Sequence, residues 1–294
     1  MCQGVDTEIY FTAKDPIFQT LKPYSFRFPP SDDLPCENFD REKWPLRVQD
    51  ARELGPNIDV QGFCLERFPT RMSYGDFAIA EKIENVYAKE LESALFEQFQ
   101  ARHVRVVDYL VRRRHRKYPK LEIEDVTEAQ PASLAHIDFS HEEAISMIRA
   151  LYGERAQELL QHRWQLINTW RPLKGPLNDW PLAICDAQSF DAQQDALVAD
   201  VVYPTWSYEN VLVHFNTSQK WYYFPGLEVE ETLLFRCTDS ERPSAGSCPH
   251  ASFPNPNCSQ DGVPRESIEA RAFVFYAPIE EFPKAKGTVY GQKE

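Results

Sequence analysis

The spacing of apolar residues predicts an amphipathic helix in the first third of the chain. From Asp76 to about Gln100, after Gly75, apolar side chains recur every three to four residues. They are Ile79, Ile83, Val86, Tyr87, Leu91, Leu95 and Phe96. An α-helix has 3.6 residues per turn, so this spacing places them on one face. A second helix, of about twenty residues, is predicted after Ser140, because Ser140 and Glu143 have the spacing of a capping box.

The second half of the chain has the pattern of short strands. A first strand is predicted earlier, at Val104–Val111, which is rich in β-branched residues. From Trp164 to Tyr276, short apolar or alternating segments are separated by Pro, Gly, Asn and Asp. The predicted strands are Trp164–Trp170, Leu182–Cys185, Leu197–Tyr203, Asn210–Phe215, Trp221–Phe224, Thr232–Cys237 and Ser267–Tyr276. The fold class is therefore α+β and mainly β: an antiparallel sandwich or barrel with helices on one outer face.

Residues 1–60 have a different character. They are rich in proline and lack a clear period, so we expect an irregular N-terminal arm that wraps over the core through scattered aromatic residues. No linker divides the rest of the sequence. We therefore expect a single domain over residues 1–294.

Composition and charge narrow the functional classes. The formal net charge of −13 disfavours nucleic acid and anionic membrane as partners, and the basic run Arg112–Lys117 is predicted to be a solvated connection. No run reaches the ~18 apolar residues of a membrane span, and the N-terminus lacks the pattern of a leader, so a cytoplasmic location is expected. The seven cysteines form no CxxC pair, which favours free thiols, although a Cys248–Cys258 disulfide stays open.

The segment Ala-His136-Ile-Asp138-Phe-Ser140 carries candidate metal chemistry. In an extended strand, residues two apart project from the same face, so His136 and Asp138 point to one spot. Two histidines and one carboxylate form the facial site of non-haem Fe(II) oxygenases. The motif alone also fits a strand end whose polar groups bond locally.

A facial site needs a second imidazole. His250 is the best candidate because it follows a predicted strand and its polar loop and precedes the last strand. His141 falls in the first helical turn, His214 lies inside an apolar strand, and His162 lies near a helix end.

The last strand mixes charge with aromatic residues on one face. Alternation places its odd-numbered residues together: Arg265, Ser267, Glu269, Arg271, Phe273 and Phe275. Such a face suits an arginine clamp on a carboxylate, helped by a serine hydroxyl, although salt-bridged arginines on an edge strand would give the same pattern. Phe273 and Phe275 are candidates for an apolar wall beside the substrate, and ordinary core packing is the alternative.

Ordered blocks between about residues 45 and 276 resemble a known family. They are Val48-Gln-Asp-Ala-Arg52, Gly62-Phe with Pro69-Thr70, His136-Ile-Asp138-Phe-Ser140, Asn168-Thr-Trp170-Arg171-Pro-Leu, Pro181-Leu-Ala-Ile-Cys185-Asp186, Trp221-Tyr-Tyr223, Asp239-Ser240, Pro249-His250-Ala-Ser-Phe253 and Pro264-Arg265-Glu-Ser267-Ile-Glu269-Ala-Arg271. The sequence is similar to the fungal hydroxylase/desaturase family of Fe(II)/2-oxoglutarate-dependent oxygenases, which includes gibberellin-desaturase-like and cephem-methoxylase-related proteins of secondary metabolism.

The resemblance implies a double-stranded β-helix (jelly-roll, cupin-like) fold, with iron held by His136, Asp138 and His250. It also implies that an arginine of the last strand anchors 2-oxoglutarate: Arg265 with Ser267 in one register, Arg271 in another. Arg171 is a further anion-binding candidate, and pairing with Asp179 or Asp186 is its alternative. The implied cosubstrates are 2-oxoglutarate and O2, and the implied reaction is hydroxylation, desaturation or oxidative ring closure of a small molecule.

One position departs from the family pattern. The block Asn216-Thr-Ser-Gln219-Lys-Trp221 has Gln219 where the family is expected to have histidine. If that histidine were the distal ligand, the chain would be a catalytically altered member that binds a small acid or a protein. A cupin-type metal hydrolase or isomerase is a further alternative. Gln219 is otherwise a candidate substrate contact, and a homodimer is left open.

Overall fold

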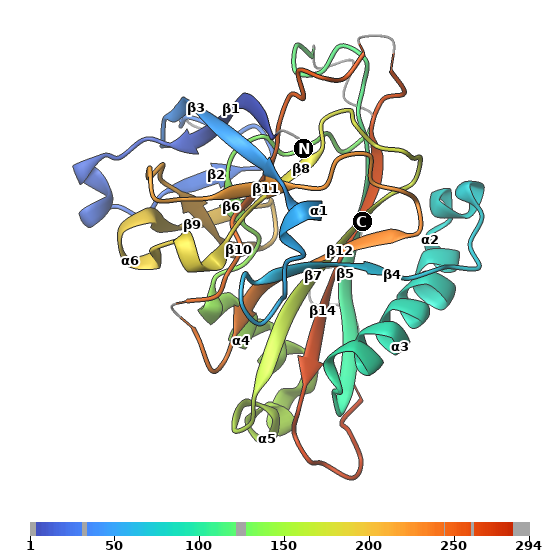
Figure 1. Ribbon diagram of the computed structural model, residues 1–294. Coiled ribbons are helices and arrows are strands. Elements are labelled where there is room, and N and C mark those ends of the chain that lie inside the picture. Colours follow the sequence, from blue (N-terminus) through green and yellow to red (C-terminus); the bar gives the residue numbers. More distant parts are fainter. Residues whose placement is uncertain (1–3, 31–33, 122–127, 244, 260–261, 285–294) are drawn as a thin grey trace.

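The computed structural model describes residues 4–30, 34–121, 128–243, 245–259 and 262–284, and its described strands form two sheets (Figure 1). In spatial order, the nine-stranded sheet contains β1 (Val5–Thr12), β3 (Arg41–Asp50), β11 (Trp221–Tyr223), β8 (Leu182–Cys185), β13 (His250–Ser252), β6 (His136–Ile137), β10 (Ser207–Val213), β9 (Ala196–Val202) and β2 (Tyr24–Phe26). The five-stranded sheet contains β4 (Phe63–Arg67), β12 (Glu231–Asp239), β7 (Trp164–Pro172), β14 (Glu266–Phe275) and β5 (His103–Arg113).

The two sheets pack face to face. Trp170 and Phe235 of the five-stranded sheet share a buried cluster with Ile184 and Tyr222 of the nine-stranded sheet. The strand pairs are antiparallel except β3 with β11 and β2 with β9. This agrees with the antiparallel sandwich that the strand pattern predicts and with the double-stranded β-helix that the family resemblance implies. All eight predicted strands are present, with ends that differ by a few residues.

Strand β14 separates two environments, as its alternation predicts. Its even-numbered residues Ile268, Ala270, Ala272 and Val274 belong to the cluster that contains helix α3 (Ala88–Phe99). Its odd-numbered residues face the other way. The register against β5 shifts after Arg271, which is a β-bulge that leaves Val107 of β5 without a partner.

The first predicted helix begins later than expected and is interrupted. Tyr74–Ala78 forms a 3-10 turn, α2 covers Ala80–Lys82, a π-helical turn covers Ile83–Tyr87, and α3 follows. Leu91 and Leu95 are buried against β5 and β14, as the pattern predicts.

The second predicted helix is split and does not join the first. Helix α4 (His141–Tyr152) and helix α5 (Ala156–Leu160) share a cluster with the odd-numbered Phe273 and Phe275. Figure 1 places α3 beside β5, and α4 and α5 on the other side of β7 and β14. The prediction of helices on one face was therefore wrong. The hydroxyl of Ser140 caps the Glu143 amide, but the Glu143 carboxylate accepts from Glu209, so only half of the capping box forms.

The N-terminal arm is more regular than expected. It contributes β1, β2 and β3, and β3 continues into the short helix α1 (Ala51–Leu54). Strand β3 lies between β1 and β11, while β2 pairs with β9. The expectation of an irregular arm was wrong. Strand β1 buries Val5, Ile9 and Phe11 on one face, whereas β3 is mostly exposed and carries little apolar periodicity.

The basic run is ion-paired and not simply solvated. Arg112 pairs with Glu269, Arg113 with Glu128 and Glu266, and Arg114 with Asp179. The prediction of a solvated connection was wrong for these three residues.

Cysteines and hydropathy behave as the sequence suggests. The six cysteines of the described residues, including Cys248 and Cys258, are free thiols, and Cys2 lies outside the described residues. The short helix α6 covers Ala192–Asp195. Among the described residues, no helix is long and apolar enough to cross a membrane.

Candidate metal centre and cosubstrate site

Three strands of the nine-stranded sheet bring the candidate ligands together. His136 lies on β6, directly opposite His250 of β13. Residues that face each other across a strand pair point to the same side, so the two imidazoles converge, with ring centroids 4.4 Å apart. Asp138 follows β6 and points back to the same spot.

The ligand atoms of this triad form a compact set. Oδ1 of Asp138 lies 3.3 Å from Nε2 of His136 and 3.7 Å from Nε2 of His250. One donor atom from each residue lies within 4.8 Å of the others. Two imidazole nitrogens and one carboxylate oxygen are the donor set expected for non-haem Fe(II).

Neighbouring carbonyls orient both imidazoles. Nδ1 of His136 donates to the carbonyl of Leu134 at 2.7 Å, and Nδ1 of His250 lies 3.4 Å from the carbonyl of Cys248. A proton on Nδ1 leaves the lone pair on Nε2, which is the atom that faces Asp138. This is the outer-shell arrangement that metal-binding histidines normally have.

Charges around the triad favour its metal-binding protonation states. Burial opposes ionisation of Asp138, but the guanidinium of Arg271 and the two histidines hold its pKa well below the usual range. Burial, and then the neighbouring His136, lowers the pKa of His250. The carboxylate is thus ionised and His250 is neutral, as a metal ligand set requires.

The other candidate histidines lie elsewhere. His141 stacks on Trp164 and bonds the hydroxyl of Thr238. His214 is buried and bonds the carbonyl of Thr12. His162 follows α5 and does not join the triad.

Gln219 is separate from the triad and serves as a loop contact. Its amide nitrogen donates to the carbonyl of His214 at 2.9 Å and to buried Asp195 at 3.2 Å. Its carbonyl oxygen is buried without a partner. Because His250 completes the set, the departure at Gln219 removes no ligand from it. Nothing in these contacts supports a role for Gln219 in substrate binding.

Arg271 is fully engaged by acidic side chains. It donates from Nε to Asp138 (2.8 Å), from Nη1 to Asp108 (2.7 Å) and from Nη2 to Glu269 (2.9 Å). A guanidinium held by three carboxylates has no free edge for another anion.

Arg265 has the opposite character. Its side chain donates to the hydroxyl of Ser267 (3.2 Å) and to the carbonyl of Trp180 (2.8 Å), and lies 4.9 Å above the ring of Trp170. No carboxylate of the described residues forms an ion pair with it, although it is only 1% exposed. Burial, and then repulsion from Arg112, lowers its pKa to about 9.

Arg171 does not join the site. Its Nη1 donates to the carbonyl of Phe68 at 3.0 Å, its Nη2 to the carbonyl of Val229, and its guanidinium lies over Tyr87. It projects toward the helix side of the sheet, whereas Trp170 faces the interior. It therefore pairs with neither Asp179 nor Asp186.

Phe273 and Phe275 belong to the core. Both are fully buried in the cluster formed with α4 and α5, where Trp164 and Tyr152 contact them edge-on. Ordinary packing, which the alternation left open, accounts for these two residues.

Polar residues without a predicted role complete the surroundings of Asp138. Asn168 donates to its Oδ2 at 2.6 Å, and Asp108 and Glu269 hold Arg271. A polar residue within the apolar strand Trp164–Trp170, at an interior-facing position, was the signal for Asn168.

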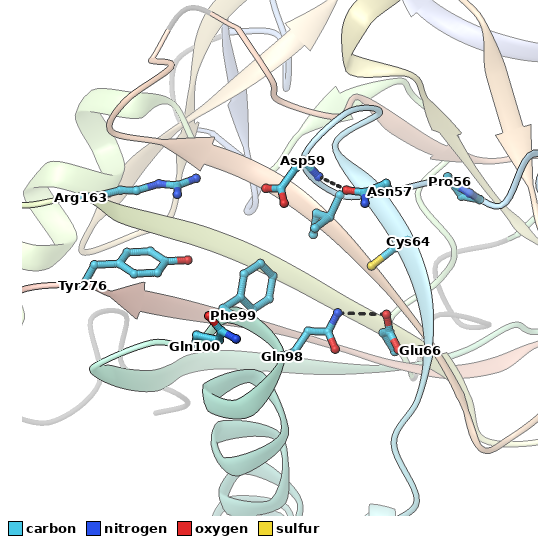
Figure 2. Close-up of a pocket in the computed structure, with 11 residues that line it drawn as sticks. Pro56, Asn57, Asp59, Cys64, Glu66, Gln98, Phe99, Gln100, Arg163 and Tyr276 are labelled. Atoms are coloured by element: carbon cyan, nitrogen blue, oxygen red, sulfur yellow. Dashed lines mark hydrogen bonds between the residues drawn. The ribbon is translucent and has the colours of Figure 1, made fainter.

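A cavity of about 340 Å³ lies at another place, between β4 and the end of α3, and Figure 2 shows residues that line it. Its lining includes Cys64, Glu66, Arg163 and Tyr276, and none of the predicted site residues. It is therefore distinct from the triad.

Known proteins share this fold and sequence pattern. The family model described as "Oxidoreductase/YMDC permease-like domain" matches residues 9–275. The hydroxylase/desaturase efuI of Hormonema carpetanum is 31% identical over 79% of this chain and 83% of its own length. The chain belongs to the fungal hydroxylase/desaturase family of Fe(II)/2-oxoglutarate-dependent dioxygenases.

Two further relatives and one solved structure are also similar to this chain. The Fe(II)/2-oxoglutarate-dependent dioxygenase nvfI of Aspergillus novofumigatus is 34% identical over 50% of this chain, and aspirochlorine biosynthesis protein N of Aspergillus oryzae is 38% identical over 42%. These two alignments span about half of each relative, 53% and 52%. The structure of the iron and alpha-ketoglutarate-dependent endoperoxidase NvfI superposes with a TM-score of 0.81 and 25% identity, over 94% of this chain and all of that one.

The dioxygenase family confirms several expectations from the sequence. The predicted jelly-roll fold, the oxidoreductase class and the cofactors Fe(II), 2-oxoglutarate and O2 are those of its named members. The donor set formed by His136, Asp138 and His250 fits Fe(II) by its chemistry.

Proposed function

We propose that this protein oxidises a C–H bond of a small molecule in fungal secondary metabolism, with Fe(II) held by His136, Asp138 and His250. The observation that carries the proposal is the convergence of two Nε2 atoms and Oδ1 of Asp138 on one point. Its relatives are named as hydroxylase/desaturases and an endoperoxidase, so the outcome is proposed as hydroxylation, desaturation or oxidative ring closure.

We propose that Arg265, with Ser267, binds the distal carboxylate of 2-oxoglutarate. A buried guanidinium without a carboxylate partner is costly, and a ligand carboxylate would supply the partner. Arg271 is the weaker candidate because three carboxylates already hold it. Arg265 contacts Ser267 on the face of β14 that also carries Glu269 and Arg271, and Arg271 donates to Asp138 at 2.8 Å, which supports a single shared site.

Each residue then has a defined task. When bound, Fe(II) would supply the oxidative chemistry in which O2 and 2-oxoglutarate give succinate and CO2, with one oxygen atom of O2 entering succinate and the other available to oxidise the substrate C–H bond. His136, Asp138 and His250 bind the metal, and Arg265 orients the cosubstrate. The two packed sheets exclude water from the interior that these side chains share.

The experiment is anaerobic addition of Fe(II) and then 2-oxoglutarate. A weak visible charge-transfer band should appear, and admission of O2 should release succinate even without substrate. Absence of both the band and succinate would overturn the proposal. It would favour a catalytically altered binding module, or a hydrolase or isomerase on the same barrel.

The partners and the cellular location of the protein are further parts of the proposal. We propose a small-molecule substrate, no nucleic-acid partner because of the net charge of −13, and a cytoplasmic protein that acts as one domain. Light scattering of the purified protein would distinguish a monomer from a homodimer.

A further inference from the structure

The two oxygens of Asp138 have different surroundings. Oδ1 faces the two imidazoles, at 3.3 Å from His136 and 3.7 Å from His250. Oδ2 accepts from Nδ2 of Asn168 at 2.6 Å and from Nε of Arg271 at 2.8 Å. The second oxygen is therefore already saturated by two donors, one of them charged.

This asymmetry bears on how many metal positions stay open. A 2-His-1-carboxylate site leaves room for its cosubstrates only if the three residues use one position each. A carboxylate that bound through both oxygens would occupy one more. Donors fixed on Oδ2 oppose that second bond.

Strand register fixes the donors in place. Arg271 of β14 lies directly opposite Asn168 of β7 on one side and Asp108 of β5 on the other. Directly opposite residues share a face, so the three side chains form one row across the sheet, under Asp138. The bulge in β5 begins immediately beyond this row.

A buried charge network prevents Arg271 from moving away. Its Nη1 and Nη2 are held by Asp108 and Glu269, and Glu269 is bound at both oxygens by Arg112, at 2.8 Å and 3.0 Å. Nη1 of Arg112 in turn donates to the carbonyl of Gln130 at 2.7 Å. Arg271 is only 7% exposed and Asn168 only 3%.

We propose that Asn168 and Arg271 are positioning residues that restrict Asp138 to coordination through Oδ1 and thereby keep metal positions open for the cosubstrates. The inference rests on the proposed iron site. It adds that the outer donors set the number of open positions as well as the orientation of the carboxylate.

The test counts open positions with nitric oxide, which binds Fe(II) without turnover. Asn168→Ala removes one donor from Oδ2. Arg271→Lys keeps a positive charge among the carboxylates but removes the Nε donor. Gln165→Ala is the matched control, because Gln165 is a buried amide on the same strand that donates to Asp239 at 2.8 Å and does not touch Asp138.

All four proteins are loaded anaerobically with Fe(II) and 2-oxoglutarate to equal measured iron content, and the iron–nitrosyl EPR signal is titrated with nitric oxide. The unaltered protein and Gln165→Ala should bind nitric oxide equally. Asn168→Ala and Arg271→Lys should bind it about 10-fold or more weakly, because a second bond from Asp138 would compete with nitric oxide for the open position; loss of an outer-shell partner changes metal affinity or activity by a similar factor. Equal nitric oxide affinity in all four proteins would overturn the inference.

A second measurement needs no variant. In a crystal structure of the Co(II)-loaded unaltered protein, Asp138 should bind Co(II) through Oδ1 alone, with Oδ2 still on Asn168 and Arg271. Binding through both oxygens would refute the inference. Failure of the unaltered protein to bind iron or cobalt would instead refute the proposed function, so the two failures are distinguishable.

Discussion

Replacement of Arg265 by methionine should remove 2-oxoglutarate binding without a large loss of stability. This combination is unusual for a residue that is 1% exposed. It follows from the absence of a carboxylate partner, which makes the buried charge a cost to the protein when no ligand is bound. Methionine keeps most of the side-chain volume and removes the charge.

The magnitude follows from the contacts of Arg265. Burial and Arg112 lower its pKa from 12.5 to about 9, and this difference corresponds to ~5 kcal/mol. Against this relief, the variant loses two hydrogen bonds, each worth about 1 kcal/mol, and a cation–π contact worth up to about 2 kcal/mol. The two sides nearly cancel, so the free energy of unfolding without ligand should stay within about 2 kcal/mol of the unaltered protein.

The assay is urea unfolding without ligand, followed by thermal unfolding of the Mn(II)-loaded protein with and without 2-oxoglutarate. At about 100 times its Kd, 2-oxoglutarate should stabilise the unaltered protein by about 2.7 kcal/mol, and Arg265→Met should lose most of this effect.

Arg236→Met is the matched control for this assay. Arg236 is equally buried but is tied to the carbonyl of Ile58 and lies 3.8 Å from the carboxylate of Asp239. Its loss should cost about 3 kcal/mol or more, because it strands buried polar groups. If Arg265→Met costs as much as Arg236→Met, or keeps the 2-oxoglutarate shift, the reasoning is refuted.

Three further predictions concern the triad, the charge network and the core. His250→Ala should abolish the Fe(II)–2-oxoglutarate band. Gln219→Ala should retain the band and lower stability by about 1–3 kcal/mol, because the buried Asp195 and the carbonyl of His214 lose a donor; loss of the band with Gln219→Ala alone would contradict the assignment. Arg112 and then Arg271 outweigh burial and lower the pKa of Glu269 from 4.5 to about 2, so its stabilisation of ~3 kcal/mol is complete above pH 4.5 and is lost as the pH falls toward 2. Urea unfolding of Glu269→Gln should therefore show a deficit at pH 7 that narrows in this window, and a deficit independent of pH would argue against the network. Leu95→Ala should lower the free energy of unfolding by 2–5 kcal/mol because Leu95 is fully buried, and a loss below about 1 kcal/mol would mean that α3 is not part of the core.

The sequence predicts the site well where the signal lies in strand alternation. His136 and Asp138 lie close together as their spacing predicts, although Asp138 follows β6. The odd-numbered face of β14 carries Glu269 and Arg271 as predicted, and Arg265, which precedes β14, contacts Ser267 on the same face. Alternation gives a face but not a partner. It could not tell that Arg271 would be held by Asp108, which lies more than 160 residues away in the chain.

The remaining features depend on contacts that a single sequence does not encode. Arg171 was an anion-binding candidate because it lies in a block that resembles the family, but its guanidinium is bound by the carbonyls of Phe68 and Val229 and lies over Tyr87. Gln219 looked like a lost ligand until the register placed His250 opposite His136. The strands β2 and β3 escaped prediction because β2 is only three residues long and β3 is mostly exposed, and both pair with strands that are distant in the sequence.

The two ends of the nine-stranded sheet carry a consequence for solubility. Its order begins with β1 and ends with β2, so both outer strands come from the first 26 residues. An open strand edge offers unpaired backbone groups that recruit other chains. Deletion of residues 4–26 would expose β3 at one end of the sheet and β9 at the other, so that one molecule would have two unprotected edge strands. Because β3 and β9 of one fragment could each pair with a strand of another molecule, the fragment should form extended aggregates instead of stopping at a dimer.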